Sequence, residues 1–315
     1  MGSFESARAY GDVCVLGLGK TGVAVARYLC SLMGEGRVRS VSVYGGATSA
    51  PGDATRELES LGARVVCGTE EVEGSYDLLV SSPGISQFSD FWRSASGHAK
   101  VSIGEPELAW AESPERWIGI TGTNGKTTTT VLTRDLLRAA GEDAEAVGNI
   151  GTMAIGEVAR RKPGEWLVAE LSSFQLAGAR ELRPRAAVLL NVTPDHLAWH
   201  RTMENYAAAK ERIFANLGEG DLAVVSDGDE WCRAITERLV GRGLRVCRLL
   251  SGGEEPDACW PCCAWEGARG LVVRLDGVEH ELVTRDELAI KGDHNVQNAL
   301  AACACALEPG ANVFV

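Results

Sequence analysis

The residues with the clearest chemical purpose lie in the stretch TGTNGKTT, residues 121–128. Gly122 and Gly125 allow backbone N–H groups to turn toward phosphate oxygens. Lys126 can reach the outer phosphates of a nucleotide, and the hydroxyl of Thr127 can ligate Mg²⁺. The stretch therefore predicts a nucleotide-phosphate site.

The context of this loop supports the same interpretation. An apolar run at 117–121 predicts a strand before the loop, and a helix is expected from about Thr127. The common phosphate-loop spacing G-x-x-x-x-G-K-[ST] would need glycine at position 120, where the chain has Ile120. The alternative is a chance Gly-Lys-Thr turn, which this strand and helix disfavour.

A second glycine loop, GLGKTG at 17–22, has the spacing G-x-G-x-x-G between an apolar run and a helical pattern. Such a loop brings the backbone close to a diphosphate at a helix N-terminus. A nicotinamide cofactor would need a carboxylate at the end of the second strand, where Tyr44 stands instead. Another nucleotide diphosphate fits equally well, and glycines used only for packing remain the third interpretation.

Composition excludes several classes of protein. The chain has 315 residues and a net charge of −12, which disfavours a nucleic-acid binder because such proteins need a basic face. No apolar run is long enough to span a membrane, and the N-terminus has no secretory pattern. The ten cysteines lack a framework spacing, and the Cys259, Cys262 and Cys263 group lacks further ligands, so we expect reduced thiols and a cytoplasmic protein.

Apolar runs alternate with helical patterns along the whole chain, which predicts an α/β fold with parallel sheets. We expect an N-terminal Rossmann-like domain at 1–112 and a central P-loop mononucleotide-binding α/β domain at 113–308. Two alternating runs around Asp276 and Gly277 predict a hairpin, and 294–307 predicts a final helix.

Six motifs together resemble the Mur ligases, the ATP-dependent amide ligases of peptidoglycan precursor synthesis. They are TGTNGKTT, AELSSFQL (169–176), NVTPDHL (191–197), YAAAKERIF (206–214), GDHNVQNALAA (292–302) and SSPGI (81–85). The last of these, with ELSSFQL, is most similar to the D-glutamate-adding branch. The resemblance implies a monomer that acts on UDP-N-acetylmuramoyl-L-alanine, ATP and D-glutamate through an acyl phosphate. It also implies two Mg²⁺ sites and no nucleic-acid or membrane partner.

The resemblance implies a role for each matching residue. The implied catalytic residues are Lys126, Glu170, His196 and Lys210. The implied metal ligands are Thr127, Glu170, His196 and Lys210, the last as a carbamate. ATP contacts fall to Gly122, Thr123, Asn124, Gly125, Lys126, Thr127, Thr128 and Asn295. Contacts to the UDP substrate fall to Gly17, Leu18, Gly19, Lys20, Thr21, Gly22, Tyr44, Ser82, Pro83, Gly84, Asn149 and Ser172.

Each of these residues also has an ordinary structural interpretation. We expect Glu170 and His196 to end apolar strands, but an exposed glutamate or a helix-capping histidine would give the same pattern. Asn149 could simply form a turn, and Ser172 could satisfy the local backbone. Asn295 is also expected as the N-cap of the final helix.

Three further points stay open on the sequence alone. Lys210 could be a surface lysine, and His98, His200 and His280 are expected to be structural or exposed. Tyr44 replaces the family's uracil-binding pattern, and its ring could stack on the base. Ala198 and Trp199 replace the usual Asp-Arg after DHL, which leaves the local substrate contacts open.

The family resemblance also predicts a third, C-terminal domain. Residues 309–315 would then begin the linker that leads to it. A chain without that domain is expected to bind its ligands but not to complete the reaction. A folylpolyglutamate synthase-like ligase and a non-catalytic nucleotide-binding module are the alternatives. The glycine loop and SSPGI motif of the first domain disfavour the folylpolyglutamate enzyme.

Overall fold

The computed structural model describes residues 8–251 and 256–310, and the chain divides into two compact units. The first comprises Met1–Ser113 with the later segments Met153–Arg160 and Ala177–Arg180. The second comprises Pro114–Thr152, Arg161–Leu176 and Glu181–Val315. The domain boundaries given above stay a prediction. None of the helices in the described ranges combines the length and apolar character that crossing a bilayer requires.

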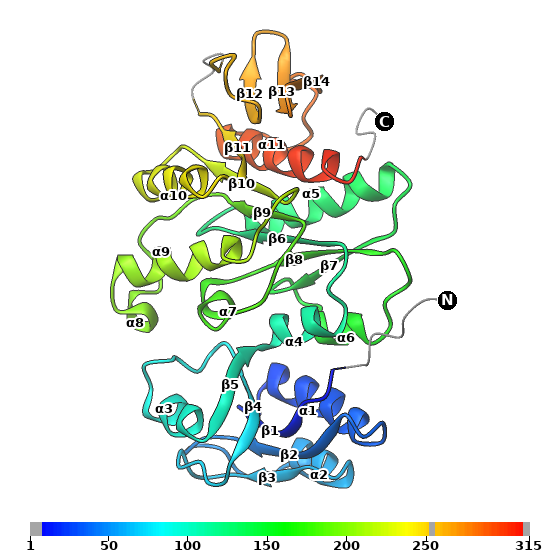
Figure 1. The fold of residues 1–315 in the computed structure, drawn as a ribbon, viewed down its shortest axis with the longest axis vertical. Helices are drawn as coiled ribbons and strands as arrows, with labels where there is room; N and C mark the ends of the chain where they lie inside the picture. The colour runs from blue at the N-terminus through cyan, green and yellow to red at the C-terminus, as the bar shows by residue number, and fades with distance from the viewer. Residues whose placement is uncertain (1–7, 252–255, 311–315) are drawn as a thin grey trace. The chain divides into compact units, whose positions relative to one another are not determined.

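The first unit is a five-stranded parallel sheet in the order β3-β2-β1-β4-β5, drawn in blue to cyan in Figure 1. Its elements are β1 (Gly11–Leu16), α1 (Lys20–Met33), β2 (Val38–Tyr44), α2 (Asp53–Ser60), β3 (Arg64–Val66), β4 (Tyr76–Ser81), α3 (Asp90–Gly97), β5 (Ala99–Gly104), α4 (Glu105–Glu112) and α6 (Ala154–Val158). The strands β1 and β4 are buried between helices, so their apolar runs are nearly continuous, as parallel strands require.

The second unit is a nine-stranded sheet in the order β14-β13-β12-β11-β10-β9-β6-β8-β7. Its strands are β6 (Trp117–Thr121), β7 (Ala144–Gly148), β8 (Trp166–Glu170), β9 (Ala186–Leu189), β10 (Leu222–Ser226), β11 (Arg245–Leu249), β12 (Cys263–Gly267), β13 (Gly270–Leu275) and β14 (Val278–Glu281). Its helices are α5 (Lys126–Ala139), α7 (Ser173–Ala177), α8 (Leu197–His200), α9 (Met203–Glu211), η1 (Arg212–Phe214), α10 (Glu230–Gly241) and α11 (Asp293–Leu307).

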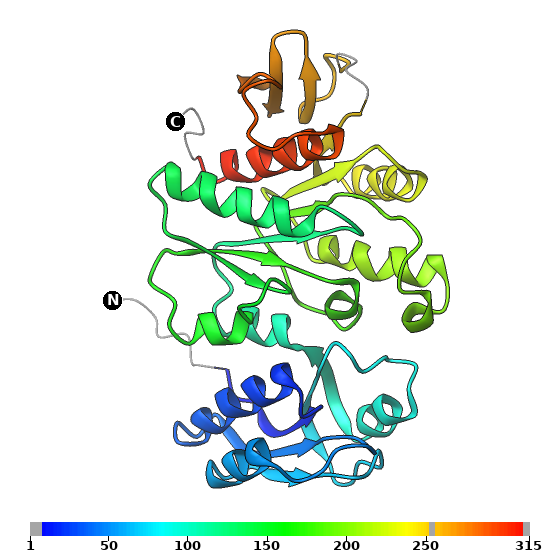
Figure 2. The ribbon, with the colours of Figure 1, turned by 180° about the vertical axis from the view of Figure 1, so that it is seen from behind.

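Helices cover both faces of the second sheet. The helices α5 and α11 lie side by side on one face, and α9 and α10 lie on the other (Figures 1 and 2). The expected α/β class with parallel sheets is confirmed, because every pairing from β7 to β12 is parallel. A core of buried side chains from β6, β8, β9, β10 and α11 joins the sheet to the α5–α11 layer.

The predicted hairpin is also confirmed. The strands β13 and β14 pair antiparallel, with Leu275 opposite Val278, so the turn has two residues. Those residues are Asp276 (φ 52°) and Gly277 (φ 81°). Positive φ at both positions is typical of the tight turn whose twist matches that of the flanking strands, which explains the Asp-Gly pair.

One buried carboxylate ties the end of α11 to the sheet. The Glu308 side chain is 2% exposed and lies 2.8 Å from the Arg185 guanidinium, with Arg245 paired to its other oxygen. Arg245 also pairs with Asp276 of the hairpin turn at 2.6 Å. A buried carboxylate held by two guanidiniums is costly to leave unpaired. These ion pairs therefore connect the end of α11 to β11, to the segment before β9 and, through Arg245, to the β13–β14 turn.

This ion cluster generates a stability prediction. Glu308→Gln should lower the free energy of unfolding by about 1.5 kcal/mol, because the buried end of α11 loses its charge-assisted contacts to Arg185 and Arg245. Urea unfolding followed by tryptophan fluorescence would measure the change.

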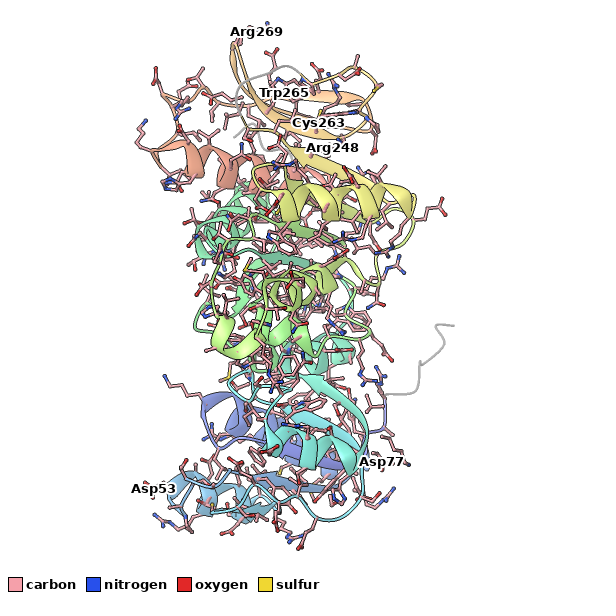
Figure 3. All side chains as sticks on the ribbon, turned by 90° about the vertical axis from the view of Figure 1, so that its left-hand side faces the viewer. Asp53, Asp77, Arg248, Cys263, Trp265 and Arg269 are labelled. Carbon is pink, nitrogen blue, oxygen red and sulfur yellow. The ribbon has the colours of Figure 1, made fainter. Side chains whose placement is uncertain are left out.

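The matched control is Arg269→Gln in the turn between β12 and β13, which Figure 3 labels. Arg269 pairs with Glu281, and both side chains are exposed to solvent. Its loss should change the same free energy by less than about 0.5 kcal/mol. Equal effects of the two substitutions would contradict a stabilising role for the buried cluster.

Candidate functional site

The phosphate loop joins β6 to α5 as the sequence predicts, and glycine is required at its end. Gly125 caps α5 with φ +84°, and a Cβ there would lie 2.4 Å from the Asn298 amide oxygen. Only glycine combines this backbone conformation with so close a neighbour. The helix begins at Lys126, so the first N–H groups of α5 point into the loop.

The Lys126 ammonium curls back over this loop. Its Nζ donates to the carbonyl oxygens of Gly122 and Thr123, at 3.0 and 2.9 Å. Burial lowers the pKa of Lys126, although the carboxylates of Glu170 and Asp195 act in the opposite direction. A lysine in this position places a positive charge at the concave side of the loop, where phosphate oxygens would lie.

Glu170 gathers two of the other predicted residues around it. It is the last residue of β8 and is 2% exposed. Thr127 Oγ1 donates to its Oε2 at 2.8 Å, and Asn149 Nδ2 donates to its Oε1 at 2.9 Å. The strand-end position predicted for Glu170 is therefore confirmed. Side chains from the start of α5, from the segment after β7 and from the end of β8 therefore meet at one point.

His196 does not end a strand, which corrects the expectation. The strand β9 ends at Leu189, and His196 follows in the connecting loop, immediately before α8. Its φ of +52° is unusual for a residue other than glycine, and its side chain makes no cap hydrogen bond. Its Nδ1 lies 3.4 Å from a carboxylate oxygen of Asp195, and its imidazole is about half exposed.

Lys210 is not a surface residue. It is 1% exposed, and its Nζ donates to the Gly122 carbonyl oxygen at 2.7 Å. The same ammonium lies 4.6 Å from the centre of the Tyr206 ring. Burial, followed by the charge of Lys126, lowers the pKa of Lys210 to about 7, so much of this amine is neutral near physiological pH. Lys126 and Lys210 are far apart in the sequence, but both therefore donate to the Gly122 carbonyl oxygen.

His200 also lies inside the second unit. It is fully buried, and its Nε2 lies 2.9 Å from Ser173 Oγ. Burial, together with the charges of Lys210 and His196, lowers the pKa of His200 to about 4, so the ring is neutral at pH 7. The open expectation for this residue is resolved in favour of a structural histidine. His98 is likewise bound locally, since its Nδ1 lies 2.7 Å from the Gly74 carbonyl oxygen.

Asn295 is not the N-cap of the final helix, which corrects that expectation. Gly292 caps α11, and Asn295 is the third residue inside it. Its side chain donates to the Lys291 carbonyl at 2.9 Å and accepts from Asn298 at 3.1 Å. Ser172 has the local role that the sequence left open, since its hydroxyl and N–H both donate to the Gln175 side chain.

Sequence reasoning missed three residues that line the phosphate loop. Tyr206 places its hydroxyl 3.0 Å from Thr123 Oγ1. Asn298 is 4% exposed and lies against Gly125. Asn191 accepts the Asn124 N–H at 2.8 Å. Two of them had a signal in the sequence. Tyr206 lies one helical turn before Lys210 in YAAAK, and Asn298 is the second asparagine of HNVQN.

The glycine loop of the first unit is a close-packed turn with a polar atom beside it. A Cβ on Gly22 would lie 1.9 Å from the Gly17 carbonyl oxygen, so glycine is required there for packing. Ser82 Oγ faces Gly17 and, among the described residues, is buried without a hydrogen-bond partner. An unpartnered hydroxyl at this place is consistent with a ligand that hydrogen-bonds to it.

A cavity of about 390 Å³ opens beside the same loop in the first unit. It is lined by Leu18, Gly19, Lys20, Val23, Ala24, Arg27 and Met153. Two of the predicted contact residues in this lining, Gly19 and Lys20, are exposed. The other predicted residues of the first unit lie nearby in sequence: Thr21 in the first turn of α1, and Pro83 and Gly84 in the turn after β4. Thr128, predicted for the second unit, lies in the first turn of α5. The cations of the cavity lining are Lys20 and Arg27, and the Arg27 guanidinium also donates to the Glu57 carboxylate at 2.6 Å.

The position of Tyr44 does not fit the expectation that its ring stacks on a nucleotide base. The residue is 1% exposed and belongs to the core of the first unit. Its hydroxyl donates to the Glu73 carbonyl oxygen at 3.1 Å. A ring buried in this way cannot stack on a nucleotide base, so the suggested uracil contact is wrong.

Comparison with known proteins decides the family. The sequence profile of the Mur ligase middle domain matches residues 120–306. The chain belongs to the Mur ligase family. The UDP-N-acetylmuramoylalanine–D-glutamate ligase of Geobacillus kaustophilus is 40% identical over 304 residues, which cover 95% of this chain. The ligase of the same name from Pelotomaculum thermopropionicum is 37% identical over 306 residues, also 95% of this chain.

This Mur ligase chain spans 63% of the length of each of those two relatives. Among solved structures, UDP-N-acetylmuramate:L-alanyl-gamma-D-glutamyl-meso-diaminopimelate ligase from Neisseria meningitides matches 97% of this chain and 95% of its own, with a TM-score of 0.56 and 20% identity. That likeness supports the fold. The resemblance noted from the six motifs is confirmed.

The phosphate loop of this Mur ligase generates the second prediction. Lys126→Ala should weaken binding of a Mg²⁺–ATP analogue about 10- to 100-fold, because a charge-assisted contact to phosphate is lost. Isothermal titration calorimetry would measure the dissociation constant.

The matched control is Lys162→Ala, which removes an exposed lysine of the same unit. It should leave the dissociation constant unchanged. Unaltered affinity after Lys126→Ala would mean that the phosphates bind elsewhere.

Proposed function

We propose that this Mur ligase acts in the ATP-dependent addition of D-glutamate to UDP-N-acetylmuramoyl-L-alanine, in cytoplasmic peptidoglycan precursor synthesis. The observation that carries the proposal is the meeting of Thr127 with Glu170, at 2.8 Å, beside a lysine-bearing phosphate loop. Relatives named for this reaction are 33–40% identical to the chain, which supports the choice of substrates.

The reaction requires an activated carboxylate, because a carboxylate and an amine do not condense spontaneously in water. The γ-phosphoryl group of ATP would pass to a carboxylate oxygen of the UDP-linked substrate and release ADP. The amine of D-glutamate would then attack the acyl carbon, lose a proton and expel inorganic phosphate. Lys126 and the N–H groups at the start of α5 would offset the repulsion between carboxylate and phosphate.

The side chains around Glu170 fit a divalent cation. Mg²⁺ prefers oxygen ligands, and the Thr127 hydroxyl and the Glu170 carboxylate meet there, with Asn149 turned to Glu170 through its amide nitrogen. In the described part of the chain, no three His, Cys, Asp or Glu side chains form a ready-made metal site. Bound Mg²⁺ would supply charge neutralisation at the phosphates, and Thr127 and Glu170 would hold it.

A second cation site would use His196 and Lys210. An ammonium cannot ligate a cation, so Lys210 would have to carry a carbamate, in which CO₂ is bonded to its nitrogen. The amine is buried beside Lys126, which favours the neutral form that reacts with CO₂. A carbamate nitrogen retains one N–H, so the bond to the Gly122 carbonyl could persist.

The first unit would hold the UDP part of the substrate at the GLGKTG loop. The unpartnered Ser82 hydroxyl and the cavity lined by Lys20 and Arg27 support this assignment. Uracil recognition would have to use residues other than the buried Tyr44.

The experiment that tests the function is calorimetry on the chain with three ligands. UDP-N-acetylmuramoyl-L-alanine and a Mg²⁺-bound, non-hydrolysable ATP analogue should each bind once, and NAD⁺ should not bind. The two sites should also respond to different substitutions. Ser82→Ala should weaken only the UDP compound, and Lys126→Ala only the ATP analogue. Tight NAD⁺ binding without binding of the UDP compound would refute the proposal.

The carbamate generates a separate prediction. In buffer containing ¹³C-bicarbonate, NMR should detect one carbamate signal that increases as the pH rises through about 7, because the neutral amine is the reactive form. Lys210→Gln should abolish the signal.

Lys162→Gln, at an exposed lysine, is the control and should leave the signal intact. Where ligation is assayed, Lys210→Gln should also reduce its rate at least 100-fold, as about 3 kcal/mol of lost transition-state stabilisation would do. No Lys210-dependent signal at any pH would exclude the carbamate.

A further inference from the structure

His200 is enclosed by aromatic rings in the second unit. Its ring stacks on Phe174 with centroids 5.6 Å apart and an interplanar angle of 18°. Trp199 and Tyr206 complete the enclosure, with centroids 4.4 and 5.2 Å from the imidazole. The side chain is fully buried. Water does not reach its ring nitrogens, so they can form hydrogen bonds only with neighbouring protein groups.

Only one of the two ring nitrogens has a partner among the described residues. Nε2 lies 2.9 Å from Ser173 Oγ, and Nδ1 is buried without a hydrogen bond. A tautomer with the proton on Nδ1 would leave a buried N–H donor unpaired. The tautomer with the proton on Nε2 leaves only a lone pair unpaired, which costs less. The imidazole is therefore expected to donate from Nε2 to the Ser173 hydroxyl.

This hydrogen bond connects the segments that carry two proposed metal ligands. Ser173 begins α7, three residues after Glu170. The backbone N–H of His200 donates to the His196 carbonyl oxygen at 3.1 Å, and its own carbonyl accepts from Asn205 Nδ2 at 2.9 Å. Tyr206, which packs on the imidazole, reaches Thr123 of the phosphate loop.

We propose that His200 is a positioning residue, whose Nε2–H fixes the Ser173 hydroxyl and so holds the loop after Glu170 against the segment that carries His196. The inference deepens the proposed function and rests on it. His200 touches neither nucleotide nor cation in this role. It sets the separation of two proposed ligands, Glu170 at the end of β8 and His196 in the segment between β9 and α8. Residues that orient metal ligands in this indirect way commonly contribute 10- to 100-fold to affinity.

The test uses three variants of the chain and one binding measurement. His200→Phe keeps an aromatic ring but removes the donor. Ser173→Ala removes the acceptor but keeps the ring. His200→Gln keeps an amide N–H that can reach the same hydroxyl. Calorimetry measures the affinity of a non-hydrolysable ATP analogue with and without Mg²⁺, and thermal unfolding reports whether each variant is folded.

Loss of the hydrogen bond should affect only the Mg²⁺-dependent part of binding. His200→Phe and Ser173→Ala should each weaken binding about tenfold with Mg²⁺ present and leave Mg²⁺-free binding unchanged. The double variant should be no worse than either single one, since both remove the same bond. His200→Gln should recover most of the affinity, which a purely space-filling role for the histidine would not produce.

Each contrary result has a defined meaning. Folded Ser173→Ala or His200→Phe with parental Mg²⁺-dependent affinity would overturn the inference while leaving the proposed function intact. If His200→Gln binds the Mg²⁺-bound analogue as weakly as His200→Phe does, the hydrogen-bond donor is not what matters. That result would also overturn the inference. A parent chain that binds no Mg²⁺–nucleotide would overturn the proposed function itself, and the inference with it. If His200→Phe does not fold, Ser173→Ala and His200→Gln still decide.

Discussion

The Gly122 carbonyl oxygen accepts hydrogen bonds from two lysines, and the arrangement of the candidate site follows from this pairing. Lys126 approaches from the start of α5 and Lys210 from α9, at 3.0 and 2.7 Å. Two ammonium groups that share one acceptor oxygen repel each other, and besides burial the charge of Lys126 accordingly lowers the pKa of Lys210. The repulsion is relieved in part by Asp195, and in part because the pKa of Lys210 falls to about 7.

Such a pair of amines suits a site for polyanions. A nucleotide triphosphate would supply the negative charge that the loop lacks, and the Lys126 ammonium already lies against the loop backbone. Lys210 is the less hydrated of the two because it is buried, so its protonation is the more easily changed. Lys126 is thus placed for the phosphate contact that we propose, and Lys210 for the proposed carbamate.

The parallel sheet explains why residues distant in sequence meet here. The strand β6 lies between β8 and β9, so the loops that follow these three strands leave the sheet at one edge. Thr127 at the start of α5, Glu170 at the end of β8 and Asn191 after β9 therefore surround the phosphate loop. Ligands of α/β proteins bind outside the carboxyl ends of strands for this reason. Asn298 adds a contact from α11, which packs beside α5 on the same face.

The sequence alone determined what depends on local geometry and on alternation of apolar residues. The TGTNGKTT loop, the Asp276-Gly277 turn and the parallel strands of the two sheets follow from glycine conformation and from buried strand runs, which neighbouring residues encode. The strand-end position of Glu170 follows in the same way. Only the tertiary structure decided the burial of Tyr44, Lys210 and His200, because burial depends on which distant segments pack against a side chain. The position of Asn295 inside α11, and of His196 beyond the end of β9, likewise depended on where packing and capping end each element.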